Sequence, residues 1–405
     1  DMLLSVTITI VMMFIFIYSL SFARSDRFYP FILPLIVVMN AALFTVNLFI
    51  LFISLCAEII LYGFLLYYNH KNSKIVLNFM LLSLIVSILF LISISILYHR
   101  YNSFDITYIS GVFKFESLEK IALVFIITPF LIKSGVIPVY NLTLAIYKEA
   151  NAYVSALFFI DTHFWLYMMF KLLLNIFGVH ASIISYLLIF IAIISMLTAL
   201  LFSLVELDIR KLLGYISVIQ VCYILLAFST AYFVIKDYIA TQTFGVYAMI
   251  GAMLHMFSNL TCIPALFLIS GIITNVCKTQ DMRSIAGLSS MKKLMVSLLI
   301  VSFSIVGIPP FNGFPSKFLI YESVFKLNPI LSIIAIFVSI VVLFSLLNLF
   351  LCVLTGKVKE IRDINGQVLI SITLFMLVIL VSGVFSDIAI DEVIKPAVNS
   401  FIGIE

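Results

Sequence analysis

Long apolar runs, separated by short polar stretches, make up almost the whole chain. About 12 of these runs are long enough to cross a hydrocarbon core about 30 Å thick. We predict crossings at residues 2–20, 29–47, 48–68, 75–98, 117–146, 152–176, 182–205, 213–233, 243–275, 293–326, 330–355 and 367–386. The run from Phe28 to Tyr68 is too long for one crossing, and we divide it near Asn47. Every crossing is expected to be α-helical, because a helix satisfies its own backbone hydrogen bonds without water.

The composition supports a membrane protein. Of the 405 residues, 64% are hydrophobic and only 10% are charged, whereas a soluble domain carries about 25% charged residues. Because so few charges cannot cover a water-exposed surface, we predict an all-α integral membrane protein. The five cysteines form no CxxC pair and are expected to pack in the apolar runs rather than bind metal or form disulfides. They are Cys56, Cys222, Cys262, Cys277 and Cys352.

The basic residues divide unevenly when the loops are assigned alternately to the two sides of the membrane. One side receives about 14 and the other about 6, and the richer side is expected to face the cytoplasm or matrix. The richer set is Arg24, Arg27, Lys71, Lys74, Lys148, Arg210, Lys211, Lys278, Arg283, Lys292, Lys293, Lys357, Lys359 and Arg362. The poorer set is Arg100, Lys114, Lys120, Lys236, Lys326 and Lys395. Both termini would then face the periplasm or intermembrane space, in a prokaryotic cell membrane or the mitochondrial inner membrane. The first run lacks a small-residue cleavage site and is expected to be a retained crossing.

Ionisable residues inside the apolar runs are candidates for function, because an unpaired charge at the bilayer centre costs several kcal/mol. Glu58 lies in ISLCAEIILYGF, far from either end of its run. The alternative role for Glu58 is structural, as a neutral carboxyl bonded to a neighbouring helix. Lys133 lies in FIITPFLIKSGVIPVYN, about 15 residues from either end of its run, so snorkelling to the surface explains it poorly. Pro129, Gly135 and Pro138 lie around Lys133 and are expected to break the helix.

Two histidines also lie within apolar runs. His163, with Asp161 beside it, is in SALFFIDTHFWLYMMF, and His255 is in MIGAMLHMFSNL. A histidine pKa near 6.5 suits reversible protonation, although either residue could instead be a hydrogen-bonded packing residue. Asn259 follows His255 by four residues and is expected on the same helix face. We therefore take the two histidines as relay candidates and Asp161 and Asn259 as auxiliary ones.

Lys317 lies in SIVGIPPFNGFPSKFLIYES, the most heavily interrupted run. The residues expected to break this helix are Gly307, Pro309, Pro310, Gly313 and Pro315. A helix broken inside a membrane is tolerated only where the freed backbone faces protein or water. Glu322 follows on the same run and is a candidate auxiliary acid.

The Lys133 and Lys317 runs share one design, in which an interrupted helix carries a central lysine. Each is the fourth crossing of a five-helix set if residues 29–176 and 182–355 form two sets. An odd number of crossings inverts the second set relative to the first, and interrupted helices at matching places in inverted halves indicate a transport site. Residues 1–28 would form a separate first crossing, and residues 356–405 the last crossing and tail. A lysine–carboxylate pair whose spacing changes can act as a proton switch, and histidines with trapped waters can carry the proton onward.

At these residues the sequence resembles the antiporter-like subunits of respiratory complex I, membrane-bound hydrogenases and Mrp-type cation/proton antiporters. The similarity covers nearly the whole chain. Its most specific segments are DMRSIAGLSSMKKL and VGIPPFNGFPSKFLI, the second of which resembles the family's twelfth helix and places its lysine at Lys317. AEIILYGF is similar to the fifth helix and places the family's glutamate at Glu58. LIKSGVIPVYNLTLAIYKEANAYVSAL is similar to the broken seventh helix and places the channel lysine at Lys133.

Two further segments extend the resemblance, and several positions depart from it. LDIRKLLGYISVIQ resembles the family's basic loop, and HMFSNLTCIPALFLISG resembles its broken eleventh helix, with His255 on a family histidine. The family's eighth-helix lysine falls near His163, and its second eleventh-helix histidine and lysine fall on Asn259 and Ile263. The chain would begin at the family's third helix, with Asp1 on an aspartate often found there, and two earlier helices would be absent or on another chain. The lack of a long lateral helix after the last crossing argues against the most distal complex I type.

Three functions follow as hypotheses. The first is a proton- or sodium-translocating subunit of a membrane-bound redox complex, of the NADH dehydrogenase or energy-converting hydrogenase type. No motif for NADH, flavin, quinone or an iron–sulfur cluster is recognised, so no cofactor is expected on this chain. Flavin, iron–sulfur or nickel–iron centres would lie on partner subunits. The partners expected are other membrane subunits, including further antiporter-like ones, and lipids, but no nucleic acid. The alternatives are a subunit of a non-redox Na⁺/H⁺ antiporter and a degenerate subunit that only holds an assembly together.

Overall fold

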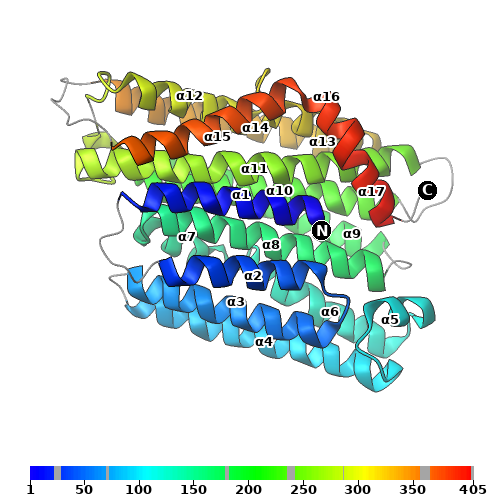
Figure 1. The fold of residues 1–405 in the computed structure, drawn as a ribbon. Coiled ribbons are helices and arrows are strands. Elements are labelled where there is room, and N and C mark those ends of the chain that lie inside the picture. Colours follow the sequence, from blue (N-terminus) through cyan, green and yellow to red (C-terminus); the bar gives the residue numbers. More distant parts are fainter. Residues whose placement is uncertain are drawn as a thin grey trace.

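Long helices lie side by side through the part of the chain that the structure describes (Figure 1). This computed structural model describes residues 1–21, 29–69, 73–177, 182–234, 242–285, 287–355 and 365–402. No β-strand occurs in these ranges, and the all-α prediction is confirmed. Seven of the basic residues used to predict sidedness lie outside the described residues, so the orientation stays a prediction. They are Arg24, Arg27, Lys71, Lys236, Lys357, Lys359 and Arg362.

Each predicted crossing corresponds to one helix or to one interrupted pair of helices. The uninterrupted ones are α1 (Met2–Ser19), α2 (Tyr29–Phe44), α3 (Leu48–Asn69), α4 (Ser73–Tyr101), α8 (Ala152–Ile176), α9 (Ser182–Val205), α10 (Ile209–Val234), α11 (Gln242–Cys277), α14 (Pro329–Leu354) and α15 (Gly366–Val384). Nine helices in the described ranges are long and apolar enough to span a membrane, and α2 is a shorter apolar helix. The division near Asn47 is confirmed, since its side-chain oxygen accepts from the first amides of α3, Phe49 N and Ile50 N.

The two interrupted crossings are present where the sequence predicts them. The first consists of α6 (Ser117–Lys133) and α7 (Tyr140–Glu149), and the second of α12 (Lys292–Val306) and α13 (Gly313–Leu327). Gly135 in the first break and Gly307 in the second have positive φ angles of 72° and 91°, which glycine adopts without the steric penalty of a side chain. Proline and a left-handed glycine therefore occur together in both breaks.

The structure differs from two expectations about breaks. Helix α6 continues past Pro129 to Lys133. Helix α11, whose segment HMFSNLTCIPALFLISG resembles a broken helix of the family, runs unbroken past Pro264. A membrane helix tolerates a single proline because neighbouring groups satisfy the carbonyl that it leaves free. Neither α6 nor α11 contains a glycine with positive φ, whereas each of the two breaks does. A positive-φ glycine therefore distinguishes the true breaks from these two prolines.

Short elements near the ends of the bundle were not predicted. They are α5 (Ile106–Val112), η1 (Met282–Ser284), α16 (Ser386–Ile388), η2 (Ala389–Ile394) and α17 (Lys395–Ile402). Asp105 caps the start of α5, because its carboxylate accepts from the amides of Thr107 and Tyr108. These segments are too short to be recognised from apolar length.

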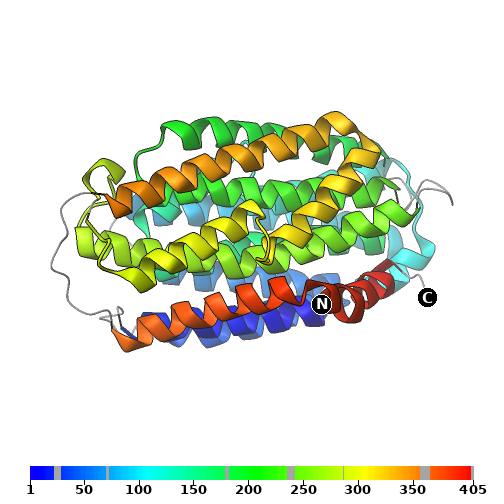
Figure 2. The ribbon, with the colours of Figure 1, turned by 90° about the horizontal axis from the view of Figure 1, so that it is seen from above.

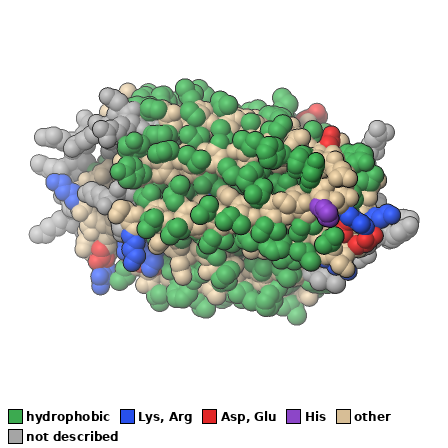
Figure 3. Space-filling model, turned by 90° about the horizontal axis from the view of Figure 1, so that it is seen from below, with side chains coloured by type: hydrophobic (Ala, Val, Ile, Leu, Met, Phe, Trp, Pro, Cys, Tyr) green, Lys and Arg blue, Asp and Glu red, His purple; other side chains and the backbone are tan. Residues whose placement is uncertain are grey.

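The most buried helices, α8, α10 and α11, lie between the α3–α4–α6 group and the α12–α14 group (Figure 1). Helices α1 and α15 are far apart in the sequence but lie side by side, as Figure 2 also shows. There, Ser371 of α15 donates to the carbonyl oxygen of Phe14 at 2.7 Å. Hydrophobic side chains cover the middle of the face in Figure 3, and the charged ones gather at its two ends. This distribution fits a multi-pass membrane protein.

Candidate functional site

Lys133 is the last residue of α6, and the first break begins directly after it. Its ammonium nitrogen lies 4.3 Å from the ring centroid of Phe79 on α4 and 5.4 Å from that of Trp165 on α8. The residue is only 6% exposed, and the nitrogen has no hydrogen-bond partner among the described residues. Aromatic faces attract a cation, but they leave its hydrogen-bonding capacity unused.

Two buried carboxyl groups lie near this lysine. Glu58 of α3 accepts a hydrogen bond from the Trp165 indole nitrogen at 3.3 Å. Asp161 of α8 faces Glu58, and both carboxyls lie within electrostatic reach of Lys133. Both acids are fully buried, and three of their four oxygens have no hydrogen-bond partner among the described residues. One amine and two acids from three helices therefore form a first cluster, and Asp161 belongs to it.

Lys317 forms the centre of a second cluster beside the second break. It lies in the second turn of α13, and its ammonium nitrogen donates to the Ser339 hydroxyl of α14 at 2.5 Å. The same nitrogen lies 4.4 Å from the ring centroid of Tyr223 on α10. Ser339 donates in turn to the carbonyl oxygen of Val306 at 3.1 Å, where α12 ends. Lys317 is 2% exposed, and through Ser339 its nitrogen is linked to the backbone at the start of the break.

His255 of α11 belongs to the second cluster. Its Nδ1 lies 3.0 Å from the Ser316 hydroxyl, and its ring lies 5.6 Å from that of Tyr223. Lys317 is within electrostatic reach of the imidazole. The Nε2 atom is buried without a partner among the described residues. The imidazole therefore keeps one nitrogen open for a water molecule or a proton.

His163 faces away from the first cluster although it is only two residues from Asp161. Residues two positions apart on an α-helix are related by a rotation of about 200°, so the side chains of Asp161 and His163 point to opposite sides of α8. The Nδ1 atom of His163 lies 3.2 Å from the carbonyl oxygen of Phe159, and its Nε2 has no partner among the described residues. His163 lies within electrostatic reach of His255. Helix α8 thus presents one candidate residue to each cluster.

The second break also contains a polar residue that the sequence analysis missed. Asn312 accepts from the hydroxyls of Ser304 at 2.6 Å and Ser258 at 3.1 Å, and it donates to Thr261 at 3.2 Å. These contacts attach the break to α11 and to the end of α12. Within the segment PPFNGFP an asparagine directly before a glycine indicates a turn, but the sequence does not show which helix the asparagine contacts.

The structure corrects one auxiliary residue. Glu322 lies at the surface, where it forms an ion pair with Lys326 at 2.7 Å, and it is absent from the second cluster. Glu322 follows Lys317 by five positions, which turns its side chain about 140° away from that of Lys317, so we exclude it from the relay. Asn259 is buried one turn after His255, and its amide lies 3.5 Å from the carbonyl oxygen of Gln220.

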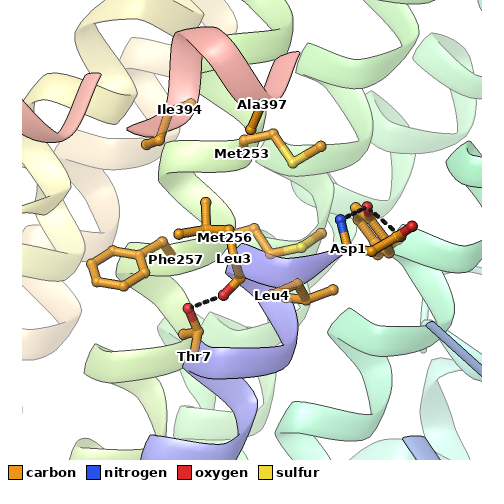
Figure 4. A pocket seen from close by; sticks show the side chains of 10 residues that line it. Asp1, Leu3, Leu4, Thr7, Met253, Met256, Phe257, Ile394 and Ala397 are labelled. Atoms are coloured by element: carbon orange, nitrogen blue, oxygen red, sulfur yellow. Dashed lines mark hydrogen bonds between the residues drawn. The ribbon is translucent and has the colours of Figure 1, made fainter. Parts of the chain in front are cut away.

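Lys171 is a second residue that the sequence analysis missed. It lies near the end of α8, where its ammonium nitrogen donates to the Asp1 carboxylate at 2.9 Å and to the carbonyl oxygen of Leu43. The Tyr167 hydroxyl donates to the other oxygen of Asp1 at 3.0 Å. Asp1 lies at the edge of a cavity of about 40 Å³, opposite Met253 and Met256 of α11 (Figure 4). A lysine close to the end of an apolar run looks like a snorkelling residue, which is why this ion pair was not predicted.

Comparison with known proteins places this geometry in a family. Residues 41–345 match the family model described as NADH:quinone oxidoreductase/Mrp antiporter, TM. The chain belongs to this family. It is 25% identical over 344 residues to a Na⁺/H⁺ antiporter subunit of Alkalihalophilus pseudofirmus, covering 83% of this chain and 67% of the relative. It is 26% identical over 335 residues to an NADH-quinone oxidoreductase subunit of Rickettsia felis, covering 80% and 65%. The chain therefore spans about two thirds of the length of these relatives.

Solved structures show the same fold. The chain superposes with a TM-score of 0.86 on a chain of the Mrp complex from Dietzia, at 18% identity, covering 98% of this chain and 83% of that one. The TM-score is 0.87 for a chain of respiratory complex I from Thermus thermophilus, at 18% identity, with 99% of this chain and 85% of that one covered. For a chain of an archaeal membrane-bound sulfane sulfur reductase the TM-score is 0.83 at 20% identity, with 94% of this chain and 64% of that one covered. The protein is thus an antiporter-like membrane subunit of the Mrp and complex I type, and the family predicted from the sequence is confirmed.

Proposed function

We propose that this antiporter-like chain translocates protons within a larger membrane complex. The observation that carries the proposal is the position of Lys133, which is buried, placed at a helix break and left without a hydrogen-bond partner among the described residues, beside two acids. Removing a charge from water costs several kcal/mol, and without a hydrogen bond the nearby acids and aromatic faces offset only part of that cost. Such a residue weakens the fold, so its presence supports a role in transport over a purely structural one.

The proposed route joins the two clusters through α8. A proton would pass from Glu58 and Asp161 to Lys133, and from there through water to the other side of α8. His163 and His255, each with an Nε2 that has no partner among the described residues, would carry it to Lys317. Ordered waters that hydrogen-bond buried polar groups are ordinary components of proteins. The described contacts support the two ends of this route, and the waters between them belong to the proposal.

The chemistry of the second cluster favours a proton over a sodium ion. The groups that contact Lys317 and His255 are hydroxyls and an aromatic face, and no described carboxylate contacts either residue. A hard cation prefers several oxygen ligands, with carboxylates among them. An ammonium and an imidazole instead bind and release protons. Sodium, if the complex moves it, would cross elsewhere.

The proposal has two forms, which differ in the energy source that drives the complex. In the first form, the chain is a subunit of a redox complex whose flavin, iron–sulfur or nickel–iron centres lie on partner subunits. The similarity to a subunit of NADH-quinone oxidoreductase supports this form. In the second, the chain belongs to a Na⁺/H⁺ antiporter without redox chemistry, which the similarity to the Alkalihalophilus protein supports. Mass spectrometry of the subunits that co-purify with the chain separates the two.

The test of translocation uses the two buried lysines and a surface one. Lys133→Ala and Lys317→Ala are expected to leave the complex assembled and to cut proton uptake into proteoliposomes at least about tenfold, since each removes a proton carrier. Lys326→Ala, which removes an exposed lysine from α13, is the matched control and should transport normally. Wild-type uptake in a variant lacking both buried lysines would refute the assignment.

A further inference from the structure

An open groove lies between α12 and α15 on the outer surface of the bundle and has a volume of about 360 Å³. It begins at Lys292 and Lys293, the first two residues of α12, and follows that helix to Ile300. The start of α12 lies at the same end of the bundle as the end of α11, the end predicted to be rich in basic residues. We call this feature the α12–α15 groove.

The mouth of the groove is positively charged. Both lysines are exposed, neither forms an ion pair with a described residue, and no acidic residue is among the described residues that line the groove. Met291, which precedes the first residue of α12, makes no side-chain cap, whereas Asn328 and Asn365 cap the starts of α14 and α15. The first turn of a helix leaves backbone amides free and carries a partial positive charge. The Lys292 amide donates to the Ser290 carbonyl oxygen at 3.0 Å, so the two ammonium groups and the partial positive charge of the helix start are what attract an anion.

The walls of the groove are apolar. Ile372 and Met376 of α15 are 4% and 7% exposed, and Val296 of α12 is 55% exposed. The Ser297 and Thr373 hydroxyls donate to carbonyl oxygens of their own helices. A molecule bound in the groove therefore does not have to accept hydrogen bonds from them. From Lys293 to Ile300 the groove extends about 10 Å along the helix axis, roughly a third of the hydrocarbon core.

We propose that the α12–α15 groove binds an anionic phospholipid. Its phosphate would contact Lys292 and Lys293, and one acyl chain would lie along Ile300 and Ile372. Basic pockets between membrane helices bind anionic headgroups in this way. A free phosphate would gain nothing from the apolar walls, and an uncharged apolar helix of a partner subunit would leave the two lysines without an anion. The charged mouth and apolar walls therefore select a lipid.

The proposed lipid would join two helices that hold the second break. Helix α12 leads directly into the break, and α15 touches the break near its other end, where a Cβ added to Gly383 would lie 2.3 Å from the carbonyl oxygen of Pro310. A lipid between the two helices would stabilise their spacing and with it the position of Lys317. Lipid binding itself does not depend on whether the chain moves protons.

The experiment measures lipid retained by the complex purified through this chain. Complexes reconstituted with phosphatidylglycerol or phosphatidylcholine are delipidated in detergent and examined by native mass spectrometry. The variant K292Q/K293Q removes the charge, and Val296→Trp fills the groove without changing charge. The charge control is K148Q/K278Q, on the same end of the bundle, and the size control is Val124→Trp, an exposed valine of α6.

We expect phosphatidylglycerol to be retained by the wild type and by both controls. K292Q/K293Q should bind it about 25-fold more weakly, since each lysine near an anionic headgroup contributes about fivefold, and Val296→Trp should lose it. Phosphatidylglycerol, but neither phosphatidylcholine nor inorganic phosphate, should raise the thermal stability of the wild-type complex. Equal retention by all variants would overturn the proposal, as would a partner subunit that crosslinks to a cysteine placed at Val296.

Discussion

Substitution of Gly383 tests whether the second break must keep its position for transport. This glycine of α15 lies against the backbone of the break, and an added Cβ would lie 2.3 Å from the Pro310 carbonyl oxygen and 2.6 Å from the Asn312 amide nitrogen. Ordinary contacts begin near 3.4 Å, so Gly383→Ala must separate the two backbones by about 1 Å. Because the contacted atoms are backbone atoms, no side-chain rotation can relieve the clash.

The cost of this displacement can be estimated in two ways. Overpacking of this kind lowers the free energy of unfolding by about 1–3 kcal/mol. A shift of about 1 Å in a group that positions a reacting atom can lower a rate by about 100-fold. Asn312 and Val306 border the break, and Ser339, which accepts from Lys317, donates to Val306. We therefore expect proton uptake to fall between about 10- and 100-fold, while the complex still assembles.

The assay is proton uptake into proteoliposomes, measured with a pH-sensitive dye. A native gel of the same preparations shows whether the complex is assembled. Gly366→Ala is the matched control, because it adds the same methyl group to the same helix at a place where no other part of the described chain comes within 4 Å. It should behave as the wild type. If Gly383→Ala transports protons as fast as Gly366→Ala, the break does not set the position of Lys317.

Three further substitutions test the first cluster and the Asp1–Lys171 pair. Trp165→Phe removes the hydrogen bond to Glu58 and is expected to cost about 1–3 kcal/mol of stability because the carboxyl is left unpartnered, which thermal unfolding of the complex would measure. Asp161→Asn removes a buried acid within electrostatic reach of Lys133 and should slow proton uptake at least about fivefold; unchanged uptake would place it outside the route. Lys171→Met breaks the ion pair with Asp1 and, since the Asp1 side chain is 32% exposed, should cost about 1–2 kcal/mol rather than the larger amount measured for fully buried pairs. The double variant with Asp1→Asn should recover part of that loss.

The crossings could be predicted from the sequence because the thickness of the bilayer fixes how long an apolar run must be. The short end segments, such as α5 and α17, could not, since no length requirement identifies them. Proline alone was an unreliable guide to breaks. Pro129 and Pro264 lie inside continuous helices, whereas both true breaks add a glycine with positive φ, at Gly135 and Gly307.

The sequence identified the buried lysines but not all of their neighbours. A charge deep in an apolar run has no aqueous surface within reach, so the burial of Lys133 and Lys317 follows from position alone. Which acid lies beside a lysine depends on packing between helices. Glu322 is close to Lys317 in the chain but lies at the surface, and Asp161 lies on a different helix from Lys133 and yet within electrostatic reach of it.

Helix α8 shows how much of such packing is already determined by helix geometry. Asp161 and His163 cannot face the same cluster, because they are two positions apart and a helix turns about 200° over that distance. His163, Tyr167 and Lys171 follow one another at intervals of four residues, so they line one side of α8. Tyr167 and Lys171 both bind Asp1 beside a cavity, which extends a row of polar groups from His163 towards the end of the bundle. Such a row on one face, inside a run that is otherwise apolar, indicates a polar interface between helices, and the four-residue spacing of these side chains makes it visible on a helical wheel.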